Sequence, residues 1–95
     1  MADEEIPEEL MRLVEKMRDE YLDSEVAIAT ALADADGPLD IDALVEVTGY
    51  TERTVKKRVE SLEERLRGSP LIQRTDNETV RLHPRLAAAI QATSS

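Results

Sequence analysis

Four apolar residues that repeat with the period of an α-helix are the feature of this chain that most limits its fold. They are Val55, Val59, Leu62 and Leu66. Spacings of 4, 3 and 4 residues place their side chains within about 60° of one another around a helix axis. Thr51 is suited to cap the first turn, and Gly-Ser-Pro at 68–70 terminates a helix. The sequence therefore predicts a helix over 51–67 that buries one side and exposes the other.

The exposed side of this predicted helix is basic near its start. The polar residues opposite the apolar ones are Arg53, Thr54, Lys57 and Ser61, and those that flank them are Lys56 and Arg58. Residues 1–52 hold 16 acidic and 3 basic side chains, whereas residues 53–95 hold 9 basic and 5 acidic ones. The net charge of −9 therefore conceals a basic half, and such asymmetry indicates a surface that meets an anion.

Apolar periodicity predicts four more helices, over 6–21, 23–35, 40–48 and 84–92. The first carries one apolar stripe, while 23–35 is apolar nearly all round, which is typical of a helix at the centre of a bundle. Asp23 or Ser24 is expected to cap this central helix, and Asp40 the next one. Gly49 then provides a C-terminal stop, because glycine accepts left-handed backbone.

Residues 71–82 change to a β-type pattern, which predicts a hairpin with Asp76 and Asn77 at its tip. The expected fold is thus mainly α, with about five helices and a small β-hairpin in one domain. Its parts are an N-terminal helix within 1–22, a central unit over 23–83, and a last helix with a frayed tail over 84–95.

The composition excludes several classes of protein. Cysteine is absent, so the chain has neither a disulfide framework nor a Cys-based zinc site. No apolar run is long enough to span a bilayer, and residues 1–10 lack the layout of a signal peptide, so we expect a soluble, cytoplasmic protein. Abundant acids, with 9 Arg against 3 Lys, resemble the proteins of salt-loving archaea; the alternative is an ordinary acidic protein.

The order of helix, short helix, glycine turn, amphipathic helix and hairpin resembles the winged helix-turn-helix family of DNA-binding domains. The residues that carry the resemblance are LDIDALVEVTGYTERTVKKRVESLEERLRGSPLIQRTDNETVRL, over 39–82. With the helix 23–35 included, the resemblance covers about two thirds of the chain. It implies that the helix 51–67 enters the major groove of double-stranded DNA, which admits one α-helix.

The resemblance also implies roles for single residues. Those that face the groove are Thr51, Arg53, Thr54 and Lys57, with Ser61 on the same side. Lys56 and Arg58 reach phosphates, and Arg74 and Arg81 of the hairpin hold the adjacent backbone or minor groove. The expected function is that of a small transcriptional regulator. We also expect a homodimer, whose second copy meets the helix 6–21 or 84–92.

Two other interpretations stay open. The basic residues 53–58 are also typical of a solvated helix face. The run 37–71 also resembles the winged unit of segregation-and-condensation protein B, a partner of chromosome-condensing ATPases, although that family carries two such units. In that case the protein is an interaction module for chromosome segregation, transcription or replication, and its acidic half is the interface. The chain lacks a catalytic triad, an HExxH motif, a Gly-rich phosphate loop and clustered metal ligands, so we expect no enzyme activity, cofactor or metal.

Overall fold

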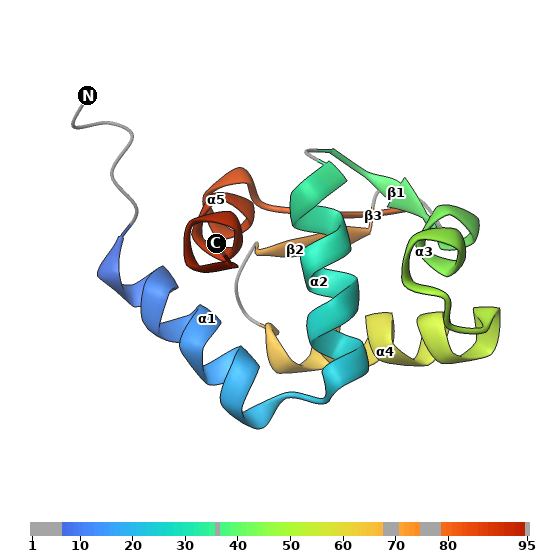
Figure 1. Cartoon of the computed structure of the whole chain (residues 1–95), viewed down its shortest axis with the longest axis horizontal. Helices are drawn as coiled ribbons and strands as arrows, with labels where there is room; N and C mark the ends of the chain where they lie inside the picture. Colours follow the sequence, from blue (N-terminus) through green and yellow to red (C-terminus); the bar gives the residue numbers. More distant parts are fainter. Residues whose placement is uncertain (1–6, 36, 68–70, 75–78, 95) are drawn as a thin grey trace.

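The computed structural model describes residues 7–35, 37–67, 71–74 and 79–94. This part of the chain forms five helices and one small antiparallel sheet (Figure 1). The helices are α1 (Glu8–Glu20), α2 (Asp23–Ala35), α3 (Ile41–Thr48), α4 (Glu52–Arg65) and α5 (Pro84–Ser94). The strands are β1 (Leu39–Asp40), β2 (Ile72–Arg74) and β3 (Thr79–Leu82). The mainly helical fold with a small hairpin, as predicted from the sequence, is confirmed.

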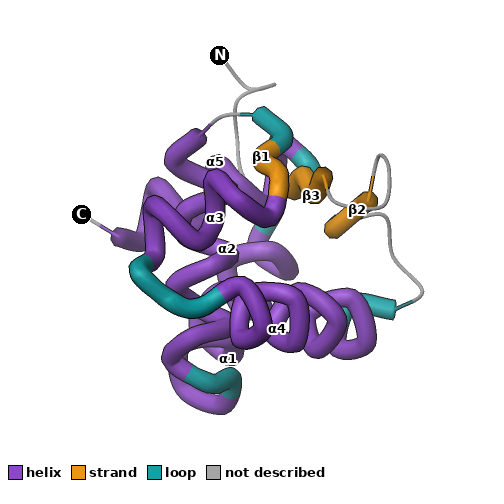
Figure 2. The backbone as a smooth tube through the Cα atoms, turned by 90° about the vertical axis from the view of Figure 1, so that its right-hand side faces the viewer, coloured by secondary structure: helices purple, strands orange, loops and turns teal. Residues whose placement is uncertain are grey.

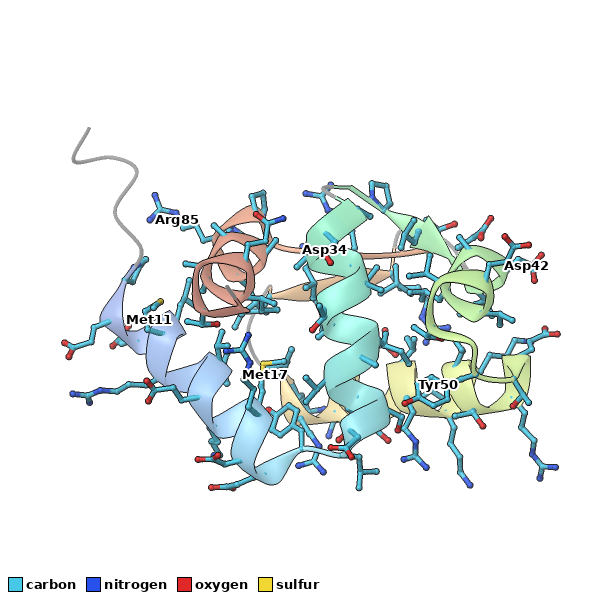
Figure 3. The ribbon with its side chains drawn as sticks, in the orientation of Figure 1. Met11, Met17, Asp34, Asp42, Tyr50 and Arg85 are labelled. Atoms are coloured by element: carbon cyan, nitrogen blue, oxygen red, sulfur yellow. The ribbon has the colours of Figure 1, made fainter. Side chains whose placement is uncertain are left out.

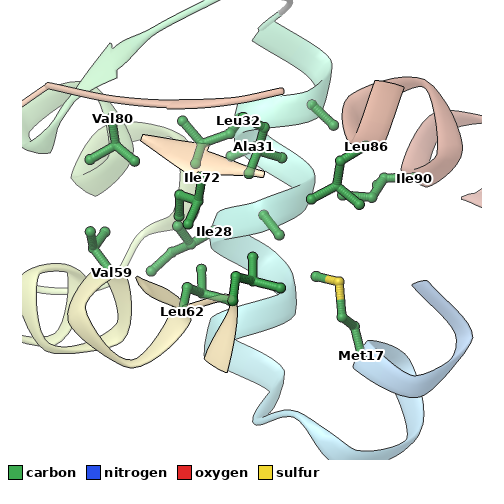
Figure 4. Packing of buried hydrophobic residues seen from close by; sticks show 14 of the residues in the cluster. Met17, Ile28, Ala31, Leu32, Val59, Leu62, Ile72, Val80, Leu86 and Ile90 are labelled. Carbon is green, nitrogen blue, oxygen red and sulfur yellow. The ribbon is translucent and has the colours of Figure 1, made fainter. Parts of the chain in front are cut away.

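The helix α2 lies at the centre of the molecule. It packs against α3, α4 and α5 and against β3, and Ile28 and Leu32 on its length are 0% and 1% exposed. Figure 4 shows both side chains within the apolar cluster, between residues of α4 on one side and of α5 on the other. An α-helix can be covered on several sides in this way only if it is apolar nearly all round, which is what its sequence indicates.

The sheet has the strand order β1-β3-β2, with both neighbours of β3 antiparallel to it. Leu39 of β1 pairs with Val80, and Ile72 of β2 pairs with Leu82. The strand β1 was not expected from the sequence, because two residues are too few to show an alternating pattern. Together with α3, the turn at 49–51 and α4, this sheet completes the winged helix-turn-helix architecture (Figure 2).

Two predictions about helix ends are wrong. Asp23 and Ser24 lie inside α2 rather than capping it, and the carboxylate of Glu25 instead accepts a hydrogen bond from the Leu22 N–H at 2.8 Å. The prediction of a frayed tail is also wrong for Thr93, because α5 continues to Ser94. Thr93 is held there by Arg18, whose guanidinium donates to its carbonyl at 2.8 Å.

Several other expectations concern residues that lie outside the described ones. They are the helix stop at Gly-Ser-Pro over 68–70, and Asp76 and Asn77 at the hairpin tip.

The helix α1 packs on its own chain. It lies against α5 and α2, and Val14 and Met17 are 1% and 2% exposed. Figure 4 shows Met17 directed from α1 into the apolar cluster. In Figure 1, α1 and the start of α4 lie at opposite ends of the molecule. The apolar stripe of α1 is therefore occupied within the chain, and α1 leaves the basic turns of α4 uncovered.

None of the helices in the described part of the chain is both long and apolar enough to cross a membrane.

The turn between α3 and α4 depends on Gly49, which has a left-handed φ of 81° and donates its N–H to the Val45 carbonyl at 2.9 Å. A Cβ at this position would meet no atom within 4 Å, so the cost of a side chain is purely conformational. We expect Gly49→Ala to lower the free energy of unfolding by about 1–2 kcal/mol in urea titrations. Gly37→Ala, where a Cβ also meets open space, is the control and should change stability by less; the reverse order would contradict this explanation.

Candidate nucleic-acid interface

The helix α4 is anchored by its apolar side and capped at its start. Val55, Val59 and Leu62 are 0%, 0% and 1% exposed, and the helix packs against α2, α3 and β2. At the N-terminus, the Thr51 Oγ1 accepts a hydrogen bond from the Thr54 N–H at 3.2 Å. The predicted cap and the predicted buried stripe are both confirmed, and they fix which side of α4 faces solvent.

The solvent-facing side of the first two turns is positively charged. Arg53 and Lys57 are exposed, and in the described part of the chain neither forms an ion pair with a carboxylate. Because they are four residues apart, the two side chains are neighbours on the helix surface. Lys56 is also exposed, but its ammonium group lies 3.1 Å from the Glu52 carboxylate. Arg53 and Lys57 are therefore the two cations of this surface that an incoming anion can reach without first displacing a carboxylate.

Two of the three hydroxyl residues predicted for the groove are less accessible than these cations. Thr54 and Ser61 are both half-buried. Thr51 is exposed, and its hydroxyl lies 3.0 Å from the hydroxyl of Thr54. The two threonines therefore bond to each other as well as to the backbone, which fixes their positions beside Arg53.

Arg58 is placed differently from the other basic residues of α4. It is half-buried, and its Nε is inaccessible to solvent and has no hydrogen-bond partner within the described ranges. Arg58 is only 60° of helix rotation from Val55, close to the buried side. Its stem is thus part of the packing of α4, and Arg58 is a flanking residue rather than a member of the exposed basic pair.

The two arginines of the hairpin lie on opposite faces of the sheet. Arg74 pairs in register with the buried Val80, whereas Arg81 is the exposed neighbour of Val80 along β3. Since successive side chains of a strand alternate between faces, Arg74 is directed to the core side and Arg81 to the other side. The structure therefore does not bring Arg74 and Arg81 together in one basic surface.

Arg74 is held by a carboxylate of α4. Its Nη2 and Nε donate to the two oxygens of Glu63 at 2.8 and 3.2 Å. Because Glu63 accepts these hydrogen bonds, the pKa of the Arg74 guanidinium is raised above its usual value. Arg81, by contrast, lies in a groove formed with the end of α2 and the start of α5, beside Leu32 and Pro84.

An ion pair between a buried glutamate and a partly exposed arginine, at the C-terminal end of α4, was not predicted from the sequence. Glu25 of α2 is 0% exposed, and one of its carboxylate oxygens lies 3.0 Å from the Arg65 Nε. The Arg65 guanidinium also stacks over the Tyr21 ring, 4.4 Å from its centroid, and burial raises the pKa of the Tyr21 hydroxyl. The only sequence signal was a glutamate at the third position of a helix, where its carboxylate can accept a hydrogen bond from the backbone N–H of the residue that precedes the helix.

Within the described residues, no three His, Asp or Glu side chains are grouped to hold a metal ion. Comparison with models of protein families, with curated proteins and with solved structures finds no match to this chain.

Proposed function

We propose that this protein binds double-stranded DNA by inserting the first two turns of α4 into the major groove. The observation that carries the proposal is the exposed pair of Arg53 and Lys57, held outward on a helix whose other side is fully buried. An arginine bonds bidentately to a guanine edge and a lysine donates to the same acceptors or to a phosphate. The pair therefore offers both sequence reading and charge neutralisation.

The distribution of acids along α4 supports insertion by its N-terminal end. The residues Glu60, Glu63 and Glu64 all lie in the second half of the helix. A duplex laid along the whole helix would be repelled there, whereas the first two turns carry a positive excess. The partial positive charge of a helix N-terminus adds to this preference.

Acidic residues of the neighbouring helix α3 limit the basic surface at the start of α4. Asp42 and Glu46 are exposed on α3, and Figure 3 shows Asp42 directed away from the body of the molecule. Phosphates are disfavoured near these carboxylates, so the contact surface is narrow. Because the salt dependence of DNA binding scales with the number of phosphates neutralised, a narrow basic surface should give binding that weakens with salt by the few contacts it makes.

The interaction-module alternative predicts an exposed apolar patch, for example around Leu10, Met11, Tyr50 or Ile90. Ile90 is 3% exposed, and the other three pack against the core as half-buried residues. The large apolar side chains that are exposed within the described ranges are Leu22, between α1 and α2, and Val47 of α3. We therefore retain DNA binding, in the service of transcription regulation, as the proposed function. Assembly as a homodimer stays a prediction.

Titration of the ¹⁵N-labelled protein with a short duplex tests the proposal by NMR. We expect the amide signals of residues 51–58 to shift most, because this segment contacts the DNA directly. The shifts should diminish as the salt concentration rises, since phosphate neutralisation releases counterions. Heparin, a polyanion without base edges, is the control. Shifts confined to α1 and α2, or equal shifts with heparin and DNA, would contradict major-groove binding.

A further inference from the structure

A groove of about 240 Å³ lies where the end of α2, the beginning of β1 and the start of α5 meet. In Figure 1 this region is in the upper part of the view and α4 is at the bottom, so the groove is remote from the surface proposed to bind DNA. With the exception of Arg81, the described residues that line the groove are apolar or glycine. They are Leu32, Gly37, Pro38, Leu82, Pro84 and Ala87. The groove thus combines one cation with an apolar lining.

The register of the sheet places Arg81 at the edge of this groove. When the antiparallel pairing of β1 with β3 is continued by one residue, Pro38 lies opposite Arg81. Both residues are exposed, whereas Leu32 and Leu82 are 1% and 7% exposed and form the inner part of the groove. A molecule in the groove therefore contacts apolar side chains with its body and meets Arg81 at the edge with a polar end.

The charges around the groove favour an anion. In the described part of the chain, Arg81 forms no ion pair with a carboxylate, and no acidic side chain lines the groove. Asp34 is exposed near the end of α2, but it is about 200° of helix rotation from Leu32 and so lies on the other side of that helix. The helix α5 begins at Pro84, in the lining of the groove, and the partial positive charge of a helix N-terminus adds to that of Arg81.

We propose that this groove binds a small organic carboxylate, with its alkyl chain against Leu32 and Leu82 and its carboxylate on the Arg81 guanidinium. A guanidinium and a carboxylate match in a bidentate pair of charge-assisted hydrogen bonds. A mainly apolar lining with a few polar groups that fix orientation is typical of small-ligand sites in proteins. The inference does not depend on DNA binding, because the groove and the basic turns of α4 lie on opposite sides of the molecule (Figure 1).

The volume of the groove limits the length of the alkyl chain. It equals the volume of about eight water molecules in the liquid, at about 30 Å³ each. Hexanoate is a carboxylate of about this size. Each methylene that leaves water should lower Kd about fourfold until the chain fills the groove, and further carbons should then add little.

NMR titrations with acetate, butyrate, hexanoate and the neutral hexanol test the proposal. The affinity should rise about tenfold from acetate to butyrate and again from butyrate to hexanoate, as methylenes are buried. Hexanoate should bind about tenfold more tightly than hexanol, because the alcohol forms no charge-assisted pair. The methyl signals of Leu32 and Leu82 should shift most. Equal affinities for hexanoate and hexanol, no binding of hexanoate, or shifts centred on other residues would overturn the proposal.

The variants Arg81→Gln and Arg85→Gln locate the carboxylate. Both remove one exposed positive charge, and within the described ranges neither arginine forms an ion pair. Arg85 does not line the groove, and Figure 3 shows it directed away from the body of the molecule. We expect Arg81→Gln to weaken hexanoate binding about tenfold and to leave hexanol binding unchanged, whereas Arg85→Gln should change either affinity less than about twofold.

Arg81→Lys separates the bidentate contact from charge alone. It retains the charge without the planar fork of the guanidinium, so its affinity for hexanoate should lie between those of the wild type and Arg81→Gln. Equal losses in Arg81→Gln and Arg85→Gln would show that general charge attraction holds the carboxylate, and would refute the assignment of the site to the groove. Thermal unfolding of all three variants confirms that the fold is retained.

Discussion

Replacing Arg53 and Lys57 together with alanine should weaken DNA binding by about 100-fold and leave the unfolding midpoint nearly unchanged. Each contact to a base edge contributes roughly 1–3 kcal/mol, so the loss of two contacts is large compared with any effect on the fold. Neither residue belongs to the apolar stripe of α4, and alanine is a strong helix former, so the helix should persist. Fluorescence anisotropy with a labelled duplex measures the affinity, and circular dichroism measures the unfolding.

The chain offers a close control for this experiment. Arg12 and Lys16 of α1 are also an arginine and a lysine four residues apart, and both are exposed. Their replacement by alanine changes the net charge by the same amount, but on the helix that lies far from the start of α4 (Figure 1). We expect this control to weaken binding only a few-fold. Equal losses in the two double variants would mean that overall charge, and not the α4 surface, governs binding.

Replacing Arg65 with alanine should lower the free energy of unfolding by about 3 kcal/mol. The substitution leaves the carboxylate of Glu25, which is 0% exposed, without its cationic partner. Breaking a buried ion pair costs about 3–5 kcal/mol when the other charge stays buried, and the lower end applies here because Arg65 is itself 40% exposed and water can follow it in. Contact with the Tyr21 ring is lost as well.

Urea titrations of Arg65→Ala and Arg67→Ala would separate this effect from a general effect of charge. Arg67 is 81% exposed and pairs with Glu64 at 3.3 Å, so its removal should change stability by at most about 0.5 kcal/mol. Glu25→Gln, which retains an oxygen that can accept from the Leu22 N–H, should cost less than Arg65→Ala. If Arg65→Ala were no more destabilising than Arg67→Ala, the buried pair would not be a structural tie between α2 and α4.

Features governed by neighbouring residues could be predicted. Thr51 and Asp40 cap their helices as expected, with the Asp40 carboxylate 2.7 Å from the Ala43 N–H, and Gly49 has the left-handed backbone that a helix stop requires. Each of these depends on a hydrogen bond or a backbone angle within a few residues. The exposed pair of Arg53 and Lys57 follows from the same local rule, since the buried stripe determines which side of the helix remains.

Features governed by contacts between distant segments could not be predicted. Arg74 and Glu63 are eleven residues apart and Glu25 and Arg65 forty apart, and no pattern in the sequence marks either pair. In the same way, the two residues of β1 become a strand only because β3 lies beside them.

The sequence by itself thus determined which segments are helical, which residues cap α3 and α4, and which basic residues of α4 stay in water, because short-range periodicity and capping control these properties. Only the tertiary structure decided that α1 leaves the start of α4 open, that Arg74 is bound by a carboxylate, and that Arg81 faces away from it. These outcomes depend on how the helices and the sheet pack, and packing is a property of surfaces assembled from segments far apart in the chain.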